Sequence, residues 1–264
     1  MSSVRSSSTS NTYGWMRGLS GLREWLRPRT IDNLVENAHV IFNRHFEKTV
    51  AVNRNSIEDD NIGIYATDFA MMGDATARLP EELVWGLLAA GFTLNGFDGV
   101  PFFSTTHPVV LADGTSGTYA NTDGGGGVRW YLFCDDRPLR PLVQQERKAP
   151  VFAAQDDVRY DNVFDRNEFV YGVDMRCNVG FGMPQLAWGS RQTRNAANYA
   201  IARAAISGFR ADGGAPLGLV PRLLVVPPSQ ESATRTLLNS EYGTGGVTNE
   251  WKGTAEVLVV PWLS

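Results

Sequence analysis

Residues 169–181 alternate between apolar and mixed positions, and this pattern constrains the fold more than any other part of the sequence. Every odd position is apolar, whereas Asp174, Arg176 and Asn178 occupy even positions. Successive side chains of a β-strand point to opposite faces, so the period predicts one strand that buries seven apolar side chains on one face. At about 3.3 Å per residue the strand would be roughly 40 Å long, well beyond an average strand. The pattern therefore predicts an extended platform.

A second period predicts a long helix that lies on this platform. Apolar residues over 65–87 recur every three or four positions, which places them on one face of a helix. Because proline has no N–H and its ring crowds the preceding turn, we expect a kink or a restart of the helix at Pro80. Ser56 and Asp59 have the spacing of a capping box, which predicts the start of the helical region, and Gly91 predicts its end.

Shorter elements are expected elsewhere. Residues 39–53 predict a hairpin with Asn43 and Arg44 at its turn, and residues 111–127, which include a run of glycines, predict a flexible surface loop. From residue 191 onward, helix and strand patterns alternate at short spacing, which predicts a compact α/β module. Two further short strands are expected at 130–134 and 151–154.

The first part of the chain predicts an arm. Residues 1–12 are rich in serine and carry too little apolar surface to order themselves, so we expect a flexible segment or a cleavage remnant. Trp15 and Trp25 follow in a segment that is too short to form a core. Such aromatic side chains need a surface to pack on, either of the same chain or of a neighbouring one.

Charge and hydropathy exclude several classes of function. The chain has 264 residues and a formal net charge of -4 at pH 7, which gives no basic surface for tight nucleic-acid binding. The longest apolar run, residues 83–92, is too short to cross a bilayer, and no signal peptide is visible. Cys134 and Cys177 do not make a disulfide framework, so we expect both as reduced core residues of a cytoplasmic protein.

The residues that could carry chemistry do not assemble a site. His107 is the best catalytic candidate because Ser104 and Asp98 are near it in sequence, but no nucleophile elbow accompanies it, which favours a structural turn histidine. His39 and His45 have no ligand at metal spacing. We therefore predict no catalytic, cofactor-binding or metal-binding residues.

The acidic clusters have structural interpretations. The run at residues 58–60 is expected at a helix start, where carboxylates favour the positive end of the helix dipole. The pairs at 135–136 and 156–157 are expected as solvated loop charges. The residues alone thus predict a non-enzymatic α+β protein with protruding parts, which need partners; repeated identical partners imply a symmetric assembly.

Eight segments, in order along nearly the whole chain, carry a family resemblance. They are residues 10–15, 22–26, 57–66, 102–108, 137–147, 162–188, 223–228 and 251–263. Together they resemble the Mu-like prophage major head subunit family, gpT. No one segment is diagnostic, whereas eight in order are strong evidence.

The resemblance implies the α+β Hong Kong-97-type fold of tailed-phage major capsid proteins. It would divide the chain into an N-terminal arm over 1–20, an E-loop hairpin region over 21–53, a spine helix and peripheral domain over 54–190, and an axial domain over 191–264. In this fold the E-loop reaches over an adjacent subunit. Family members usually carry a few tens of residues before the segment that begins at Ser10, so we expect a processed, truncated or short arm here.

The implied function is that of a structural major capsid protein, which forms pentamers and hexamers of an icosahedral shell enclosing double-stranded DNA, contacted non-specifically. Scaffolding, portal and decoration proteins are the expected partners, with no membrane, cofactor or small-molecule substrate. The expected location is the virion capsid, assembled in the bacterial host cytoplasm. Because residues 20–43 contain no lysine, we expect a shell without covalent cross-links. The alternatives are an encapsulin-type cellular compartment shell and a hydrolase that uses His107.

Overall fold

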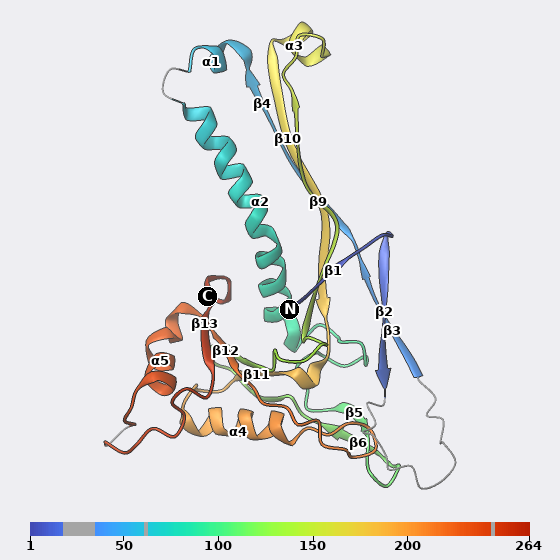
Figure 1. Cartoon of the computed structure of the whole chain (residues 1–264), viewed down its shortest axis with the longest axis vertical. Coiled ribbons are helices and arrows are strands. Elements are labelled where there is room, and N and C mark those ends of the chain that lie inside the picture. Colours follow the sequence, from blue (N-terminus) through green and yellow to red (C-terminus); the bar gives the residue numbers. More distant parts are fainter. Residues whose placement is uncertain (18–34, 61–62, 244–245) are drawn as a thin grey trace.

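The chain is elongated, and its two ends are built differently. The computed structural model describes residues 1–17, 35–60, 63–243 and 246–264. A ribbon of long strands and helix α2 (Ile64–Ala89) extend from a broader lobe (Figure 1). The lobe contains helices α4 (Ala196–Gly208) and α5 (Glu231–Asn239).

The ribbon is a four-stranded sheet with the order β1-β9-β10-β4. Its strand β10 (Glu168–Phe181) runs antiparallel to β9 (Leu142–Gln155) and to β4 (Arg44–Asn53). Strand β1 (Ser2–Arg5) lies parallel to the first residues of β9. The long strand predicted from the alternating pattern is confirmed as β10, and the strand expected at 151–154 is the far end of β9.

The prediction that β10 buries seven apolar side chains on one face is wrong. On that face only Met175, Cys177 and Phe181, in the half nearest the lobe, are buried. Farther out, Phe69 of α2 packs on Tyr171 with ring centroids 4.6 Å apart. One helix cannot cover the three strands β4, β10 and β9, so the outer half of the ribbon is only partly buried.

Helix α2 confirms the long helix predicted from the apolar period. The predicted restart does not occur, because α2 continues through Pro80, and the short turn η1 (Ala90–Phe92) ends it at the expected place. Val84 and Leu88, which follow the proline, are buried in a cluster with residues of the lobe. We attribute the continuity of the helix to this packing, which outweighs the hydrogen bond that proline cannot donate.

The capping box predicted at residues 56–59 is wrong. The short helix α1 (Arg54–Glu58) is instead capped by Asn53, whose side chain accepts a hydrogen bond in the first turn at 3.0 Å. The Asp60 carboxylate accepts a hydrogen bond from the backbone N–H of Tyr65 at 3.2 Å, at the start of α2. The last residue of the acidic run therefore stabilises a helix start, as expected.

The predicted flexible arm and the predicted hairpin are both wrong. Residues 1–12 contribute β1 and the start of β2 (Ser10–Arg17), which pairs antiparallel with β3 (Val35–Phe42). Strands β3 and β4 follow one another closely but pair with β2 and β10, so residues 39–53 do not form a hairpin. Backbone hydrogen bonds to neighbouring strands order these segments despite their small apolar surface.

The lobe is built on a five-stranded sheet with the order β13-β12-β8-β11-β7. These strands are β7 (Thr122–Gly125), β8 (Trp130–Phe133), β11 (Ala187–Arg191), β12 (Leu223–Val226) and β13 (Glu256–Val259). Trp130 and Leu132 belong to a cluster with α4 and α5, whereas Tyr131 and Phe133 belong to a cluster with the end of α2. The sheet is therefore covered on both faces, and the strand expected at 130–134 lies at its centre.

The elements predicted after residue 191 are confirmed as α4, β12, α5 and β13. They share one sheet with β7, β8 and β11, which precede that residue, so the C-terminal elements do not form a sheet of their own. The division of the chain into four domains stays a prediction. Residues 18–34, which hold Trp25 and the first part of the predicted E-loop, lie outside the described residues.

The flexible loop predicted over residues 111–127 is wrong. Strand β5 (His107–Val110) pairs with β6 (Ser116–Tyr119), and β7 joins the lobe. Gly125 has φ +97°, and a Cβ atom there would lie 2.5 Å from the carbonyl carbon of Arg191. The glycine run therefore allows two backbones to approach closely. The remaining elements are α3 (Asp161–Arg166), η2 (Pro184–Leu186), η3 (Pro228–Gln230) and η4 (Pro261–Leu263).

Candidate functional site

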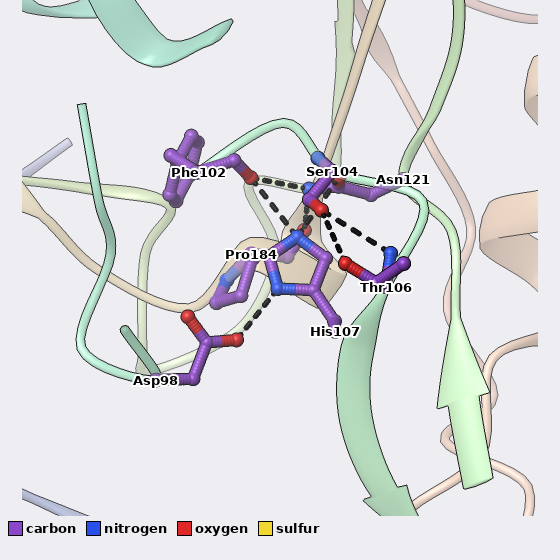
Figure 2. Close-up of polar contacts among 7 residues, drawn as sticks. All are labelled: Asp98, Phe102, Ser104, Thr106, His107, Asn121 and Pro184. Carbon is purple, nitrogen blue, oxygen red and sulfur yellow. Dashed lines mark hydrogen bonds and ion pairs between the residues drawn. The ribbon is translucent and has the colours of Figure 1, made fainter. Parts of the chain in front are cut away.

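His107 is the centre of a buried polar cluster at the start of β5. Its imidazole is fully buried, and Nδ1 lies 2.6 Å from Oδ2 of Asp98, whose side chain is 4% exposed. On the other side of the ring, Nε2 lies 3.1 Å from Oδ1 of Asn121 and 3.2 Å from the carbonyl oxygen of Phe102 (Figure 2). The sequence pointed to Asp98, but it carries no pattern that would have indicated Asn121.

The orientation of Asn121 fixes the proton on the far side of the His107 ring. Its Nδ2 donates to the carbonyl oxygens of Phe102 and Pro184 at 2.8 and 3.2 Å, so its Oδ1 is an acceptor. Both neighbours of Nε2 are therefore acceptors, and Nε2 must carry a proton. On the near side of the ring, Nδ1 and Oδ2 of Asp98 share a hydrogen bond at 2.6 Å.

This cluster lacks the arrangement of a catalytic base. Both ring nitrogens of His107 are occupied by hydrogen bonds within the buried cluster. The hydroxyl of Ser104 lies 3.1 Å from that of Thr106 and is not paired with the imidazole. A Ser–His site needs the hydroxyl within hydrogen-bond reach of an imidazole nitrogen that can accept its proton. The cluster instead joins the loop after α2 to β5 and η2.

The other candidate residues are also explained by packing. Cys134 and Cys177 are free and buried, as predicted, and burial raises the pKa of Cys134 to about 12. Burial lowers the pKa of His39, which favours its neutral form. Within the described residues there is no cluster of three or more potential metal ligands. No described helix is long and apolar enough to cross a membrane.

Apolar side chains are exposed at the far end of the ribbon. Phe164 of α3 is 84% exposed, and Val158 and Tyr160, in the turn before α3, are exposed as well. Figure 1 shows α3 at the end of the ribbon that is farthest from the lobe. No sequence pattern indicates this surface, because a single phenylalanine in a charged segment has no period.

The ribbon also has open strand edges. Strand β1 pairs with β9 only as far as Glu146, and beyond that residue the outer edge of β9 has no partner strand in the part of the chain that is described. Val151 and Phe152 lie on this open part, where Phe152 is 55% exposed. Open edges that carry apolar side chains favour association with another chain.

Solved structures of similar fold are phage capsids. The capsid of bacteriophage JBD30 matches with a TM-score of 0.85 and 28% identity, over 99% of this chain and 88% of that chain. The procapsid of bacteriophage JBD30 matches with a TM-score of 0.82 and 38% identity, over 99% of this chain and 89% of that chain. The fold is therefore the α+β, Hong Kong-97-type fold of a phage major capsid subunit.

Sequence comparisons identify the family. The family model for the Mu-like prophage major head subunit gpT matches residues 1–263. The major capsid protein of Escherichia phage Mu is 39% identical over 98% of this chain and 88% of its own length. The Mu-like prophage FluMu major head subunit of Haemophilus influenzae is 38% identical over 94% of this chain and 84% of its own length.

The chain belongs to the Mu-like prophage major head subunit gpT family, and it is a major capsid protein. The resemblance stated from the sequence is confirmed. The comparisons favour neither the cellular compartment shell nor the hydrolase that uses His107.

Proposed function

We propose that the chain assembles through its ribbon into pentamers and hexamers, which close into an icosahedral shell around double-stranded DNA. The observation that carries this proposal is the exposed apolar surface at the far end of the ribbon, above all Phe164. Burying such a side chain against another copy removes apolar surface from water, and a closed shell repeats the contact in every subunit. Modest contacts to several neighbours then hold the shell by repetition.

The two ends of the subunit have different places in this shell. The lobe, with residues 191–264 as the axial domain, lies around the symmetry axis of each pentamer or hexamer. The ribbon and the E-loop region, residues 21–53, extend over adjacent subunits. The edge of β4 and the outer part of β9 have no partner strand among the described residues, and this supports contacts of this kind, as does the exposed Phe42, which precedes β4.

Other proteins and the DNA complete the proposed assembly. One solved structure of a similar chain is described as a JBD30 capsid decorated with minor capsid protein trimers, which supports a decoration partner here. Scaffolding and portal proteins and assembly in the bacterial host cytoplasm belong to the same proposal. The net charge of -4 supports weak, non-specific contact with packaged DNA.

The shell is held together without covalent cross-links. Residues 20–43, which include the first part of the proposed E-loop region, contain no lysine that could form such a bond, and Lys48 of that region lies in β4, paired with β10. Intact-mass analysis of denatured shells is expected to show single chains. A ladder of joined subunits would contradict this part of the proposal.

Substitution of Phe164 tests the role of the ribbon in assembly. Phe164→Asp places a charge where we propose an apolar contact, so the yield of shells is expected to fall at least about tenfold, because burying an unpaired charge is costly. Phe164→Leu is the matched control and should keep most of the yield. Shells would be counted by gel filtration with light scattering and by negative-stain microscopy.

The fold of both variants is checked by thermal unfolding, which should change little because the side chain is exposed. Normal shell yield with Phe164→Asp would contradict the proposed contact.

A further inference from the structure

Two arginines lie at one end of the sheet of the lobe. Ser190 of β11 lies opposite Trp130, the first residue of β8. Arg191 is the last residue of β11, and Arg129 directly precedes β8. The backbone N–H of Gly127 donates to the carbonyl oxygen of Arg191 at 2.7 Å, which holds the segment before β8 against the end of β11. The two arginines are therefore neighbours at the same end of two adjacent strands.

Both guanidinium groups belong to the face of the sheet that packs on the end of α2. The guanidinium carbon of Arg191 lies 5.3 Å from the ring centroid of Phe92, in the turn η1. Tyr131 is fully buried on this face. Burial raises the pKa of Tyr131, and the positive charges of Arg129 and Arg191 oppose this rise. Both charges are therefore within electrostatic reach of one hydroxyl group, which places them in one region of this face.

Neither guanidinium has a partner of opposite charge. Among the described residues, Arg129 and Arg191 form no ion pair, and their side chains donate no hydrogen bond. Asp123 lies on the neighbouring strand β7, but its carboxyl group bonds to Ser190. Ser190 and Arg191 are consecutive in a strand and point to opposite faces, so this carboxyl group is on the other face. Two like charges side by side repel, and in the free subunit nothing compensates them.

The outer nitrogens of both guanidinium groups are accessible. Both arginines are half-buried, and Nε of each is buried without a partner. The Nη atoms also have no hydrogen-bond partner in the described chain, but they are not buried. The inner part of each side chain is thus enclosed by the protein, and the Nη atoms remain open to a ligand at the surface.

The charge of this pair fits a phosphate group. Each guanidinium presents a planar fork of donors that binds an oxyanion through two hydrogen bonds. A phosphate monoester carries a charge of about −1.5 to −2 at pH 7 and three acceptor oxygens, so it can bind both forks at once. Successive phosphates of a DNA strand can bind one fork each. A single carboxylate has one negative charge and two oxygens, which leaves one of the two positive charges uncompensated.

We propose that Arg129 and Arg191 together bind a phosphate group at this end of the lobe. The phosphate is supplied by free inorganic phosphate or by the backbone of duplex DNA. The second source rests on the proposed function and deepens it, because it assigns the weak contact with packaged DNA to two side chains. The site itself is complete within one subunit and does not depend on shell assembly.

Two titrations of the purified, unassembled chain at constant ionic strength distinguish the two sources. Phosphorus NMR measures binding of inorganic phosphate, and fluorescence anisotropy measures binding of a labelled DNA duplex of arbitrary sequence. We expect saturable binding of at least one probe, weakened at least about fivefold by Arg129→Gln and by Arg191→Gln, because each removes a charged donor. For the duplex, each substitution should also lower the slope of log K against log salt concentration by about one.

Arg222→Gln is the matched control. Arg222 is an exposed arginine of the lobe, and its backbone N–H donates to the carbonyl oxygen of Phe133, at the opposite end of β8. This substitution removes the same charge and should leave the binding of both probes unchanged. Arg191→Lys keeps a positive charge near Phe92 and should retain more binding than Arg191→Gln. Thermal unfolding of every variant checks that the fold is intact.

The outcomes separate the site from the shell. Duplex binding that depends on both arginines supports the site and assigns its phosphate to DNA, whereas dependent binding of inorganic phosphate alone supports the site with a free phosphate group. No saturable binding of either probe, or an equal loss in Arg222→Gln, would overturn the proposal. Equal binding of acetate in place of phosphate would also overturn it, in favour of a carboxylate partner. Because the titrations use unassembled chains, failure of this site and failure of shell assembly are distinguishable.

Discussion

The ribbon and the lobe are both built on sheets of the same chain, but they bury their strands to very different extents. Strand β8 of the lobe is buried at every residue, because helices or loops cover both faces of its sheet. Strand β10 of the ribbon is buried only toward its lobe end, and the outer part of its neighbour β9 exposes apolar side chains. The lobe therefore has a complete core within one subunit, whereas the ribbon leaves surface for other subunits.

Two phenylalanines give this comparison a direct test. Phe102 is fully buried in the lobe and stacks on Phe181 with ring centroids 4.3 Å apart. Phe152 of the ribbon is 55% exposed and lies 6.1 Å from the ring of Tyr171. We expect Phe102→Ala to lower the free energy of unfolding by about 3–5 kcal/mol, since it opens a cavity in the core.

The same change at Phe152 is expected to cost less than about 1 kcal/mol in the free subunit but to reduce shell yield. Urea unfolding of the unassembled chain measures the first quantity, and light scattering of assembled material measures the second. Similar losses of stability in both variants would remove the distinction between the two regions.

The two cysteines sharpen the comparison, because one lies in each region. Burial raises the pKa of Cys134 to about 12 and also raises the pKa of Cys177, so neither thiol is ionised at neutral pH in the folded chain. Alkylation then requires local opening, and we expect the ribbon to open more often than the lobe. In single-cysteine variants, Cys134→Ala and Cys177→Ala, the remaining Cys177 should react about tenfold faster than the remaining Cys134. Mass spectrometry measures both rates, and equal rates would mean that the ribbon and the lobe open as one unit.

The smallest change in stability is expected from the charged side chains around Asp174, on the surface of the ribbon. The side chain of Asp174 on β10 accepts hydrogen bonds from Lys148 of β9 and lies 3.1 Å from His45 of β4. The hydrogen bonds from Lys148 and then from His45 hold the pKa of Asp174 below its ordinary value of 3.8. Because the pKa is lower in the folded chain, this stabilisation is complete above about pH 4 and is lost as the pH falls through the lowered value.

Asp174→Asn should therefore lower Tm by about 1–2 °C at pH 6 and leave it nearly unchanged at pH 2. Thermal unfolding of both proteins at the two pH values gives the comparison. The same difference in Tm at both pH values would show that the contribution is not electrostatic.

The elements that could be predicted from the sequence are those whose side chains follow a period. Strand β10 and helix α2 were predicted in this way, whereas strands β8 and β12 were predicted from short runs of apolar residues. Strands β1 and β2 could not be predicted, because backbone pairing with distant strands orders them and their own side chains carry no apolar pattern. The glycine run was interpreted as a loop because glycines are common in loops. Its actual role, a close approach to the backbone of Arg191, is a tertiary contact that the local sequence does not show.

The buried His107 cluster and the exposed surface at Phe164 were predicted only in part. His107 and Asp98 are close in sequence, but that proximity did not predict their hydrogen bond. Asn121, which fixes the proton on the ring of His107, lies in a separate segment and has no motif. The exposed Phe164 could not be distinguished from a core residue, because its exposure depends on where the ribbon ends.

Hydrogen exchange on free subunits and on assembled shells tests most directly whether the ribbon is completed by other copies. The amides to compare are those of residues 148–155 that point to the open edge of β9 and not to β10, with Pro150 left out because it has no N–H, and those of residues 130–133, at the centre of the lobe. We predict that assembly slows exchange in the first group by at least about tenfold and leaves the second group unchanged, because those amides are already protected within one subunit. Unchanged exchange in residues 148–155 on assembly would contradict the account.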